Sequence, residues 1–278
     1  MTGRWNGDVW IGSGAAYFVG DARDNDLHAH YVLQIAVALN DPFHVSQDHG
    51  KSRLARGVVI PSGKRHCILS PSGAPAEVLM LFLEPNSEWG RLVHATYRLD
   101  EEEIVDIDDM HLTALKARLA HAAPGGGEPL VREMVNALTD GAWRHRGIDR
   151  RVAVALDHIE NDLQECDSLD SVAERLGLTP RYLRKLFEHE IGLSPKRYRQ
   201  WCKLRKALDG VLQGDSFTDA AATAGFTDSA HFSRTFRDMF GAPPSSIFDV
   251  GRGGPRCGGR APSASNEPSD LPAKRRVF

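Results

Sequence analysis

The chain has 278 residues, 41% of them hydrophobic, which is enough for two packed domains. Its net charge of −3 does not by itself indicate a nucleic-acid-binding protein, and four scattered cysteines disfavour a disulfide framework or a zinc knuckle. We find no signal peptide and no apolar run near 18 residues, so we expect a cytoplasmic protein without a membrane segment.

Residues 1–105 alternate short apolar runs with Gly, Asp, Asn and Pro, a pattern typical of antiparallel strands. The expected strands lie at 9–11, 15–19, 32–39, 43–45, 57–60 and 78–83. Short strands with this spacing favour a barrel or a sandwich. The sequence therefore predicts an all-β N-terminal domain.

Histidines stand at two points in this region. His28 and His30 are one residue apart and are followed by Gln34, while His66 closes a Pro-x-Gly-x-x-His run. On a strand, two residues separated by a single residue point to the same face, and a turn can bring a third imidazole beside them. These residues are similar to the two halves of the cupin signature, except that Gln34 stands where cupins carry an acidic ligand and the spacing after Gly20 is longer.

Three interpretations of this histidine group stay open. The imidazoles can bind a divalent metal such as zinc, with the neutral amide of Gln34 as a weak fourth ligand. They can instead bind an anionic effector, or form hydrogen bonds inside a metal-free pocket. The missing carboxylate favours a pocket without metal.

Two amphipathic helices are expected after the strands, separated by a Pro-Gly-Gly-Gly breaker at 124–127. Their apolar positions are Leu112, Leu115 and Leu119 in the first, and Leu130, Met134 and Leu138 in the second. These stripes either form a dimer seam or pack against the subunit's own strands. Residues 140–147 are the expected linker to the next domain.

Residues 168–244 contain one short pattern twice. Each copy has a Ser that can cap a helix, a short Ala-rich helix, a Gly where that helix ends, an apolar residue that fills the turn and a Thr that caps a second helix. The two sets are Ser168, Ala173, Gly177, Leu178 and Thr179, then Ser216, Ala221, Gly225, Phe226 and Thr227. Two helix-turn-helix units are therefore predicted, about 48 residues apart.

The charge distribution supports binding to DNA. Between Arg181 and Lys206, nine basic residues face two acidic ones, whereas residues 1–148 carry 14 basic and 19 acidic side chains and sum to −5. A local basic stripe is the expected footprint of phosphate contacts. The alternative is a helical bundle with solvated charges, and the repetition of cap, glycine and turn residue disfavours it.

The remaining segments complete the expected C-terminal domain. A first helix spans 149–163, and a long helix at 196–213 bridges the two units and fixes their separation. The segment 251–278 has six basic and two acidic residues and too few apolar ones to fold, so we expect a disordered tail.

Residues 150–248 resemble the tandem DNA-binding domain of AraC/XylS-type bacterial transcription regulators. The resemblance rests on Leu-Gly-Leu-Thr-Pro-Arg-Tyr-Leu at 176–183 and on Gly-Phe at 225–226, His-Phe-Ser-Arg at 231–234, Phe-Gly at 240–241 and Pro244. The family commonly carries a cupin-like sensor at the other end. The resemblance implies a cupin-like sensor domain at 1–105, a helical dimerisation or linker segment at 106–147, and a DNA-binding domain at 148–250.

The resemblance also implies a function. A regulator of this type reads two successive major grooves, and the positions that face DNA match Arg181, Arg184, Lys185, Ser229, Ala230, His231 and Arg234. Expected partners are operator DNA, a small-molecule effector, a second subunit and RNA polymerase, and no catalytic residues are expected. The alternative is a metal-dependent cupin enzyme fused to a DNA-binding module, which the missing carboxylate disfavours. A constitutive architectural DNA-binding protein without an effector is a third possibility.

Overall fold

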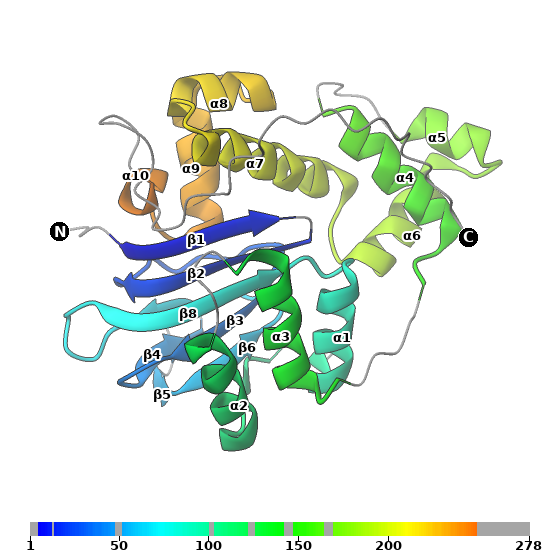
Figure 1. Cartoon of the computed structure of the whole chain (residues 1–278). Helices are drawn as coiled ribbons and strands as arrows, with labels where there is room; N and C mark the ends of the chain where they lie inside the picture. The colour runs from blue at the N-terminus through cyan, green and yellow to red at the C-terminus, as the bar shows by residue number, and fades with distance from the viewer. Residues whose placement is uncertain are drawn as a thin grey trace, which may run out of the picture.

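The computed structural model describes residues 5–12, 14–47, 52–99, 103–121, 126–141, 147–163 and 169–248. Sheets form the N-terminal part, and helices α4 to α10 form the C-terminal part (Figure 1). This confirms a sheet-rich N-terminal domain followed by an all-α C-terminal domain. The tail expected at 251–278 and most of the linker expected at 140–147 lie outside the described residues.

Two antiparallel sheets make up the N-terminal domain. The larger has the order β1 (Asn6–Gly12), β2 (Ala15–Ala22), β8 (Ala76–Leu83), β3 (Leu33–Ala38), β6 (Gly57–Ile60) and β9 (Val105–Asp106). The smaller has the order β5 (Arg53–Ala55), β4 (Phe43–Ser46) and β7 (Cys67–Leu69). All six strands expected from the apolar runs are present, whereas β5, β7 and β9 are too short to show a pattern.

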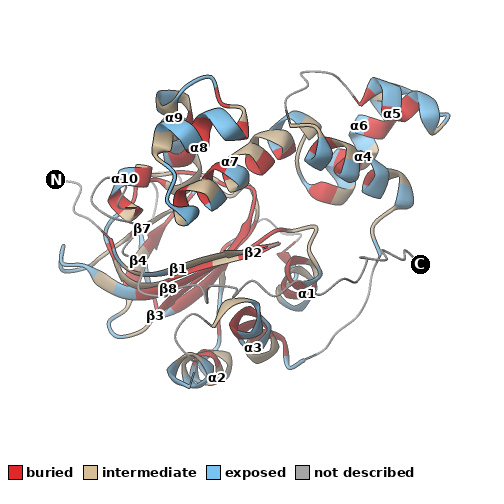
Figure 2. Cartoon of the chain, turned by 45° about the horizontal axis from the view of Figure 1, so that its top comes forward, coloured by how far each residue is buried: buried red, intermediate tan, exposed pale blue. Residues whose placement is uncertain are grey.

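Successive side chains along each strand of the large sheet pack on opposite sides. Leu33, Ile35 and Leu81 face helices α1 to α3, while Ala36 and Met80 face the small sheet. Figure 2 shows the large sheet as a buried layer between these three helices and the C-terminal helices. Strand β3 is buried along its whole length because both of its faces are covered.

The expected closed barrel is not found in the described part of the chain. Each sheet ends in two separate edge strands. Outside the strands, His28 and His66 pair through an isolated antiparallel β-bridge. Helices of the C-terminal domain cover part of the large sheet: Phe82 of β8 packs edge-on against Phe240, with ring centroids 5.6 Å apart. The N-terminal domain is therefore an open arrangement of two sheets whose apolar surface is completed by the second domain.

Three helices cover the other face of the large sheet. Helix α1 (Glu88–Tyr97) was not expected, and its start is set by Ser87, whose side chain accepts a hydrogen bond from Gly90 N. Helices α2 (Asp109–Ala120) and α3 (Gly127–Thr139) match the two expected amphipathic helices. Their buried leucines pack in the same cluster as the sheet, so these apolar stripes are used within one subunit.

The C-terminal domain contains α4 (Arg150–Asn161), α5 (Asp170–Arg175), α6 (Pro180–Ile191), α7 (Pro195–Gln213), α8 (Phe217–Ala224), α9 (Ser229–Phe240) and α10 (Pro244–Ile247). One apolar cluster runs through these helices and also includes Tyr31 and Val32, which precede β3. The aromatic ring of Tyr31 packs edge-on against Tyr198 and Trp201 of α7. The two domains therefore share a core.

Candidate nucleic-acid interface and histidine cluster

The first helix-turn-helix unit consists of α5 and α6. Gly177 has a φ of 65°, the left-handed conformation that ends a helix most easily with glycine, and Leu178 N donates to Ala173 O at 2.8 Å. Thr179 caps α6, as expected, by accepting a hydrogen bond from Tyr182 N. The expected cap Ser168 lies outside the described residues.

Helix α6 buries one face and exposes the other. Leu183 and Phe187 are fully buried, while Arg181, Arg184 and Lys185 are exposed as expected for a recognition helix. Arg184 forms an ion pair with Asp170 at 2.6 Å, and both side chains are about half exposed. Exposed pairs of this kind contribute little stability, so Arg184 can exchange this partner for a base or a phosphate.

The second unit, α8 and α9, repeats the arrangement. Gly225 has a φ of 81°, Phe226 N donates to Ala221 O at 2.9 Å, and Ser216 caps α8. The prediction that Thr227 caps α9 is wrong. Asp228 is the cap, and its carboxylate accepts a hydrogen bond from His231 N at 2.6 Å. A carboxylate beside the positive end of a helix is a stronger acceptor than a hydroxyl.

The exposure of the candidate contact residues on α9 is uneven. Ala230 and Arg234 are exposed, whereas Ser229 and His231 are half-buried. The ring of His231 stands edge-on to Phe226, with centroids 5.3 Å apart. Arg234 is therefore the charged side chain of this set that is most available for DNA, and His231 also supports the turn.

Helix α7 connects the two units, as expected for the helix at 196–213. Its residue Lys203 donates to the carbonyl of Gly225, 2.9 Å away, at the turn of the second unit. Tyr198 and Leu204 of α7 are fully buried in the C-terminal core. The helix thus holds both units at a fixed spacing.

An ion pair between the domains could not be inferred from local sequence patterns. Glu84, at the end of β8, is buried and accepts from Trp201 Nε1 at 2.9 Å and from Arg205 Nη1 at 2.6 Å. Arg205 was counted in the basic stripe, but its partner is this carboxylate. Arg205 is therefore not counted among the basic residues that are available to contact phosphates.

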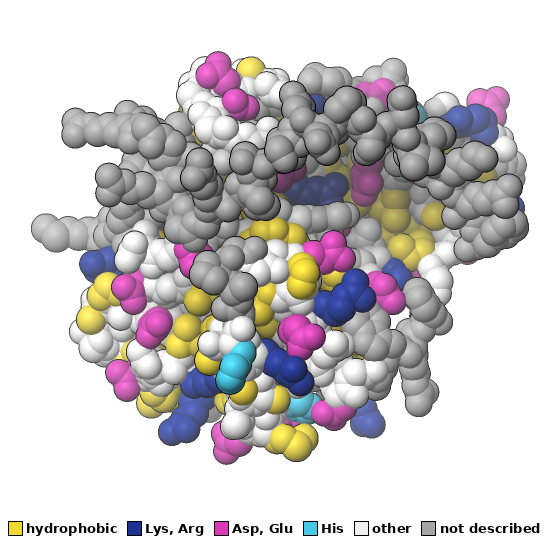
Figure 3. Space-filling model, viewed as in Figure 1, with side chains coloured by type: hydrophobic (Ala, Val, Ile, Leu, Met, Phe, Trp, Pro, Cys, Tyr) yellow, Lys and Arg dark blue, Asp and Glu magenta, His cyan; other side chains and the backbone are white. Residues whose placement is uncertain are grey.

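Charges of both signs are interspersed on one face of the N-terminal domain and of α2 and α3 (Figure 3). Arg118 of α2 pairs with Glu133 of α3 at 3.0 Å, and Arg132 pairs with Glu128 within α3. A surface with mixed charges gives no net attraction for phosphates. No helix among the described residues combines the length and apolar composition that crossing a membrane requires.

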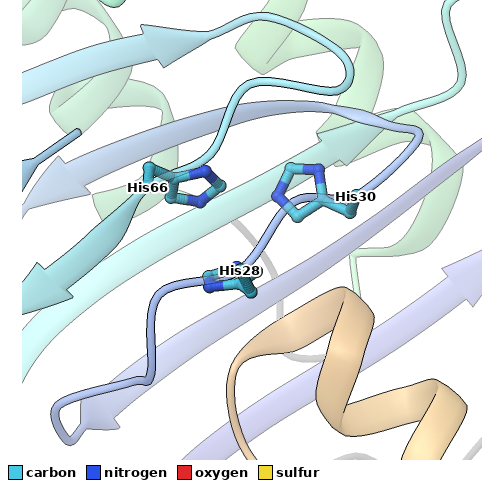
Figure 4. Close-up of side chains that lie close together, drawn as sticks. All are labelled: His28, His30 and His66. Carbon is cyan, nitrogen blue, oxygen red and sulfur yellow. The ribbon is translucent and has the colours of Figure 1, made fainter. Parts of the chain in front are cut away.

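The three histidines are brought together, although not on a strand as expected. His28 and His30 lie between β2 and β3, His66 lies just before β7, and Figure 4 shows their rings side by side. The ring centroids are 4.3 to 5.5 Å apart, and all three side chains are buried. Gln34 joins them, with Oε1 2.8 Å from His30 Nε2 and 2.9 Å from His66 Nε2.

Each histidine is also held from behind by a backbone carbonyl. The Nδ1 atoms of His28, His30 and His66 lie 2.8, 2.8 and 2.9 Å from the carbonyl oxygens of Asp26, Val32 and Lys64, respectively. A carbonyl oxygen only accepts, so Nδ1 carries the proton in each ring. A neutral ring then presents Nε2 as a lone pair.

The rings are neutral at neutral pH. Burial, and then the charge of His30, lower the pKa of His28 to about 3. Burial also lowers the pKa values of His30 and His66, which in His66 is reinforced by the other two rings. Binding of an anion needs imidazolium, so the anionic-effector interpretation of this cluster is disfavoured.

A mainly apolar cavity of about 70 Å³ lies between the large sheet and the C-terminal helices. Its walls include Phe82 of the sheet and Phe236 and Phe240 of α9, and it is bordered by His28 and Gln34. The histidine cluster therefore borders on the surface where the domains meet.

Comparisons with known proteins agree with the geometry of the C-terminal domain. Residues 172–249 match the model of a helix-turn-helix domain. The chain is 34% identical over 119 residues to the transcriptional activator RhaS of Escherichia fergusonii, covering 42% of each protein, and 29% identical over 123 residues to RhaS of Yersinia pestis, covering 43% of this chain and 45% of that protein. Residues 172–249 thus match a helix-turn-helix domain, and part of the chain is similar to the RhaS activators.

The chain thus spans less than half the length of the RhaS proteins that it matches. The similarity of fold extends further. An apo form of ToxT from Vibrio cholerae that carries a single substitution superposes with a TM-score of 0.60 at 11% identity, over 84% of this chain and 96% of ToxT. Wild-type ToxT with a bound unsaturated fatty acid gives 0.53 at 10% identity, over 85% and 95%. The arrangement of sheets and helices in both domains is therefore shared with ToxT.

Proposed function

We propose that this chain is a sequence-specific DNA-binding transcription regulator whose helices α6 and α9 enter two successive major grooves. The observation that carries the proposal is the presence of two complete helix-turn-helix units joined by α7. Each unit ends its first helix at a left-handed glycine and presents exposed arginine on its second. The similarity to transcriptional activators named RhaS supports the same function.

The proposed DNA contacts divide by exposure. Arg181, Arg184 and Lys185 on α6, and Ala230 and Arg234 on α9, are exposed and suit bases or phosphates, because arginine binds guanine and small side chains approach thymine methyl groups. Half-buried Ser229 and His231 suit contacts near the start of α9.

We further propose that a small molecule controls the regulator from the region where the domains meet. Support comes from the apolar cavity and from the shared fold with ToxT, one structure of which holds an unsaturated fatty acid. Ligand sites usually measure about 300–1,000 Å³. The cavity of about 70 Å³ is smaller, so an effector has to widen it by moving α9 or α7 against the sheet.

Homodimerisation and contact with RNA polymerase belong to this proposal as expectations from the family. The apolar stripes of α2 and α3 pack within the subunit, so a dimer must use other surfaces. The enzyme alternative receives no support from the relatives, which are named as transcriptional activators.

The test is selection of bound duplexes from random sequence with the full-length protein, followed by footprinting on the enriched sequence. We expect two protected half-sites on one side of the duplex, one helical turn or about 34 Å apart. Protection of a single short segment would contradict reading by both units, and no enrichment would contradict sequence-specific binding.

A further inference from the structure

The histidine cluster brings three potential metal ligands together. One ring nitrogen from each of His28, His30 and His66 can be chosen so that all three lie within 4.8 Å of one another. Zinc–nitrogen bonds are about 2.0–2.1 Å long, so small ring rotations would bring three nitrogens to one ion. The Nδ1–carbonyl contacts fix the tautomer and aim Nε2 away from the backbone, as the hydrogen-bond partners of ligating histidines do in metal sites.

The hydrogen-bonding pattern around Gln34 leads to two arrangements. Gln34 Oε1 and the Nε2 lone pairs of His30 and His66 are three acceptors, with Oε1 only 2.8 and 2.9 Å from the two nitrogens, and they need positive charge or protons between them. A cation supplies the charge and takes Oε1 as a ligand. Without a cation, turning the amide by 180° places its two N–H bonds toward the two rings.

We infer that His28, His30, His66 and Gln34 bind one divalent transition-metal ion. Three neutral imidazoles and an amide oxygen suit Zn²⁺ and its first-row neighbours, whereas Mg²⁺ and Ca²⁺ prefer carboxylates and other oxygen ligands. Sites with three histidines and an exchangeable fourth position are an established arrangement for zinc. In the ion's absence, the Gln34 side-chain amide bridges His30 Nε2 and His66 Nε2.

The segment that carries His28 contacts the end of the second recognition helix through Asp26. Asp26 N donates to Gly241 O at 2.8 Å, and the Asp26 carboxylate pairs with Arg237 of α9 at 2.5 Å. Gly241 lies so close that an added Cβ would stand 2.6 Å from His28 Nδ1. An ion that fixes His28 would therefore also fix the C-terminal end of α9, and through the proposed function it would change DNA affinity.

The first experiment measures metal binding without DNA. Untagged full-length protein, treated with chelator and dialysed, is titrated with Co²⁺ by visible absorption and then with Zn²⁺ as competitor. We expect one equivalent of Co²⁺ that Zn²⁺ displaces. His28→Ala and His66→Ala should weaken binding by at least about 100-fold, since even outer-shell partners contribute about 10–100-fold.

The control is His121→Ala, which removes an exposed histidine at the end of α2 and should bind metal like the wild type. Stoichiometry well below one, or the same cobalt spectrum in His66→Ala as in the wild type, overturns the metal site.

A second measurement does not depend on alanine variants that unfold. Gln34→Glu offers a carboxylate ligand, so we expect Zn²⁺ to raise its Tm more than that of the wild type, while without metal its Tm falls. If the cluster is only structural, Gln34→Glu lowers Tm equally with and without Zn²⁺. That result overturns the proposal.

The coupling to α9 has its own test. Zn²⁺ should change affinity for the selected DNA by at least about fivefold, the lower end of usual coupling between sites. Asp26→Asn should still bind Zn²⁺ but lose that change, and an unchanged response overturns the coupling. Specific DNA binding by the metal-free protein tests the proposed function separately, so the two failures are distinguishable.

Discussion

Arg184 is the residue at which base reading can be tested most directly. It is exposed on α6, and its present partner Asp170 is exposed as well. We expect Arg184→Ala to relax the preference at one base pair by about 1–3 kcal/mol, with a much smaller loss on random DNA. Competition binding on selected and random duplexes checks this. Equal losses on both would make Arg184 a phosphate contact, and Arg118→Ala on α2 is the control.

The same comparison on Arg234→Ala tests the second unit independently. Arg234 is exposed on α9 and lies on the same helix as Arg237, which is paired with Asp26 of the N-terminal domain. We expect a loss of preference confined to the other half-site, again by about 1–3 kcal/mol. A loss at the half-site read by α6 would contradict the assignment of units to half-sites.

The buried histidines should make the metal-free protein sensitive to acid. Their folded pKa values lie below the unfolded value of 6.5, and that of His28 is lowered to about 3. The unfolded chain therefore binds more protons below pH 6.5, and the free energy of unfolding falls as pH decreases from there toward 3, by up to about 1.4 kcal/mol per pH unit for each histidine.

Urea unfolding between pH 7 and pH 5 in the presence of chelator measures this loss. His28→Asn should flatten the pH dependence, whereas His121→Asn, which removes an exposed ring, should leave it as in the wild type. Identical slopes in wild type and His28→Asn would contradict a neutral buried ring at position 28.

At the scale of elements, the bridging role of α7 can be tested by changing its length. One Ala inserted after Leu208 rotates everything beyond it by about 100°. Arg205 stays on the N-terminal side of the insertion, so its pairing with Glu84 is kept. Helices α8 and α9 lie beyond the insertion and turn away from the major groove that α9 is proposed to enter. We expect specific binding to collapse to the level of one unit while the helical circular dichroism is retained.

An Ala inserted between Gly147 and Ile148, ahead of the DNA-binding domain, is the matched control because it leaves both units in register. Full affinity of the variant with the insertion after Leu208 would show that a single unit reads DNA.

Elements with strong local signals were predictable. The six longer strands, both amphipathic helices and both turns with Gly177 and Gly225 follow from apolar periodicity and backbone conformation. Helix α1 was missed because its apolar residues form a short group after a strand. The cap at Asp228 was missed because Thr227 and Asp228 are both good cap residues, and only the start of α9 distinguishes them.

Most contacts between segments far apart in the chain were not predictable. The convergence of the histidines was inferred from a motif, but their placement in connections and the role of Gln34 between two rings depend on how the sheets sit together. Nothing near Glu84 in the sequence signals its partners on α7, which lie more than a hundred positions away. The expectation of a closed barrel was wrong for a related reason. The number and spacing of strands do not reveal whether a sheet closes.

At the scale of the whole molecule, the ion pair between buried Glu84 and partly exposed Arg205 should hold the domains together. Removing one member of a buried pair leaves the other charge without compensation and usually costs about 3–5 kcal/mol. We expect Glu84→Ala to lower stability by an amount of that order and to separate thermal unfolding into two calorimetric transitions. The wild type should show one, because Tyr31 and Val32 belong to the core of the C-terminal domain.

Asp106→Ala is the matched control, because it removes a pair with Arg53 at a similar 2.5 Å distance whose carboxylate is 65% exposed. Exposed pairs contribute about 0–1 kcal/mol, so this variant should keep a single transition close to that of the wild type. Equal losses in the two variants would show that Glu84 has no special role between the domains.

The shared core also bears on how such a protein can change over generations. Phe236 and Phe240 shape the second recognition unit and at the same time line the cavity against the sheet. A gene fusion that placed this DNA-binding half behind a different sensor would leave these rings facing unmatched partners. We therefore expect substitutions at Phe82 and Phe240, whose rings are in contact, to accumulate as pairs.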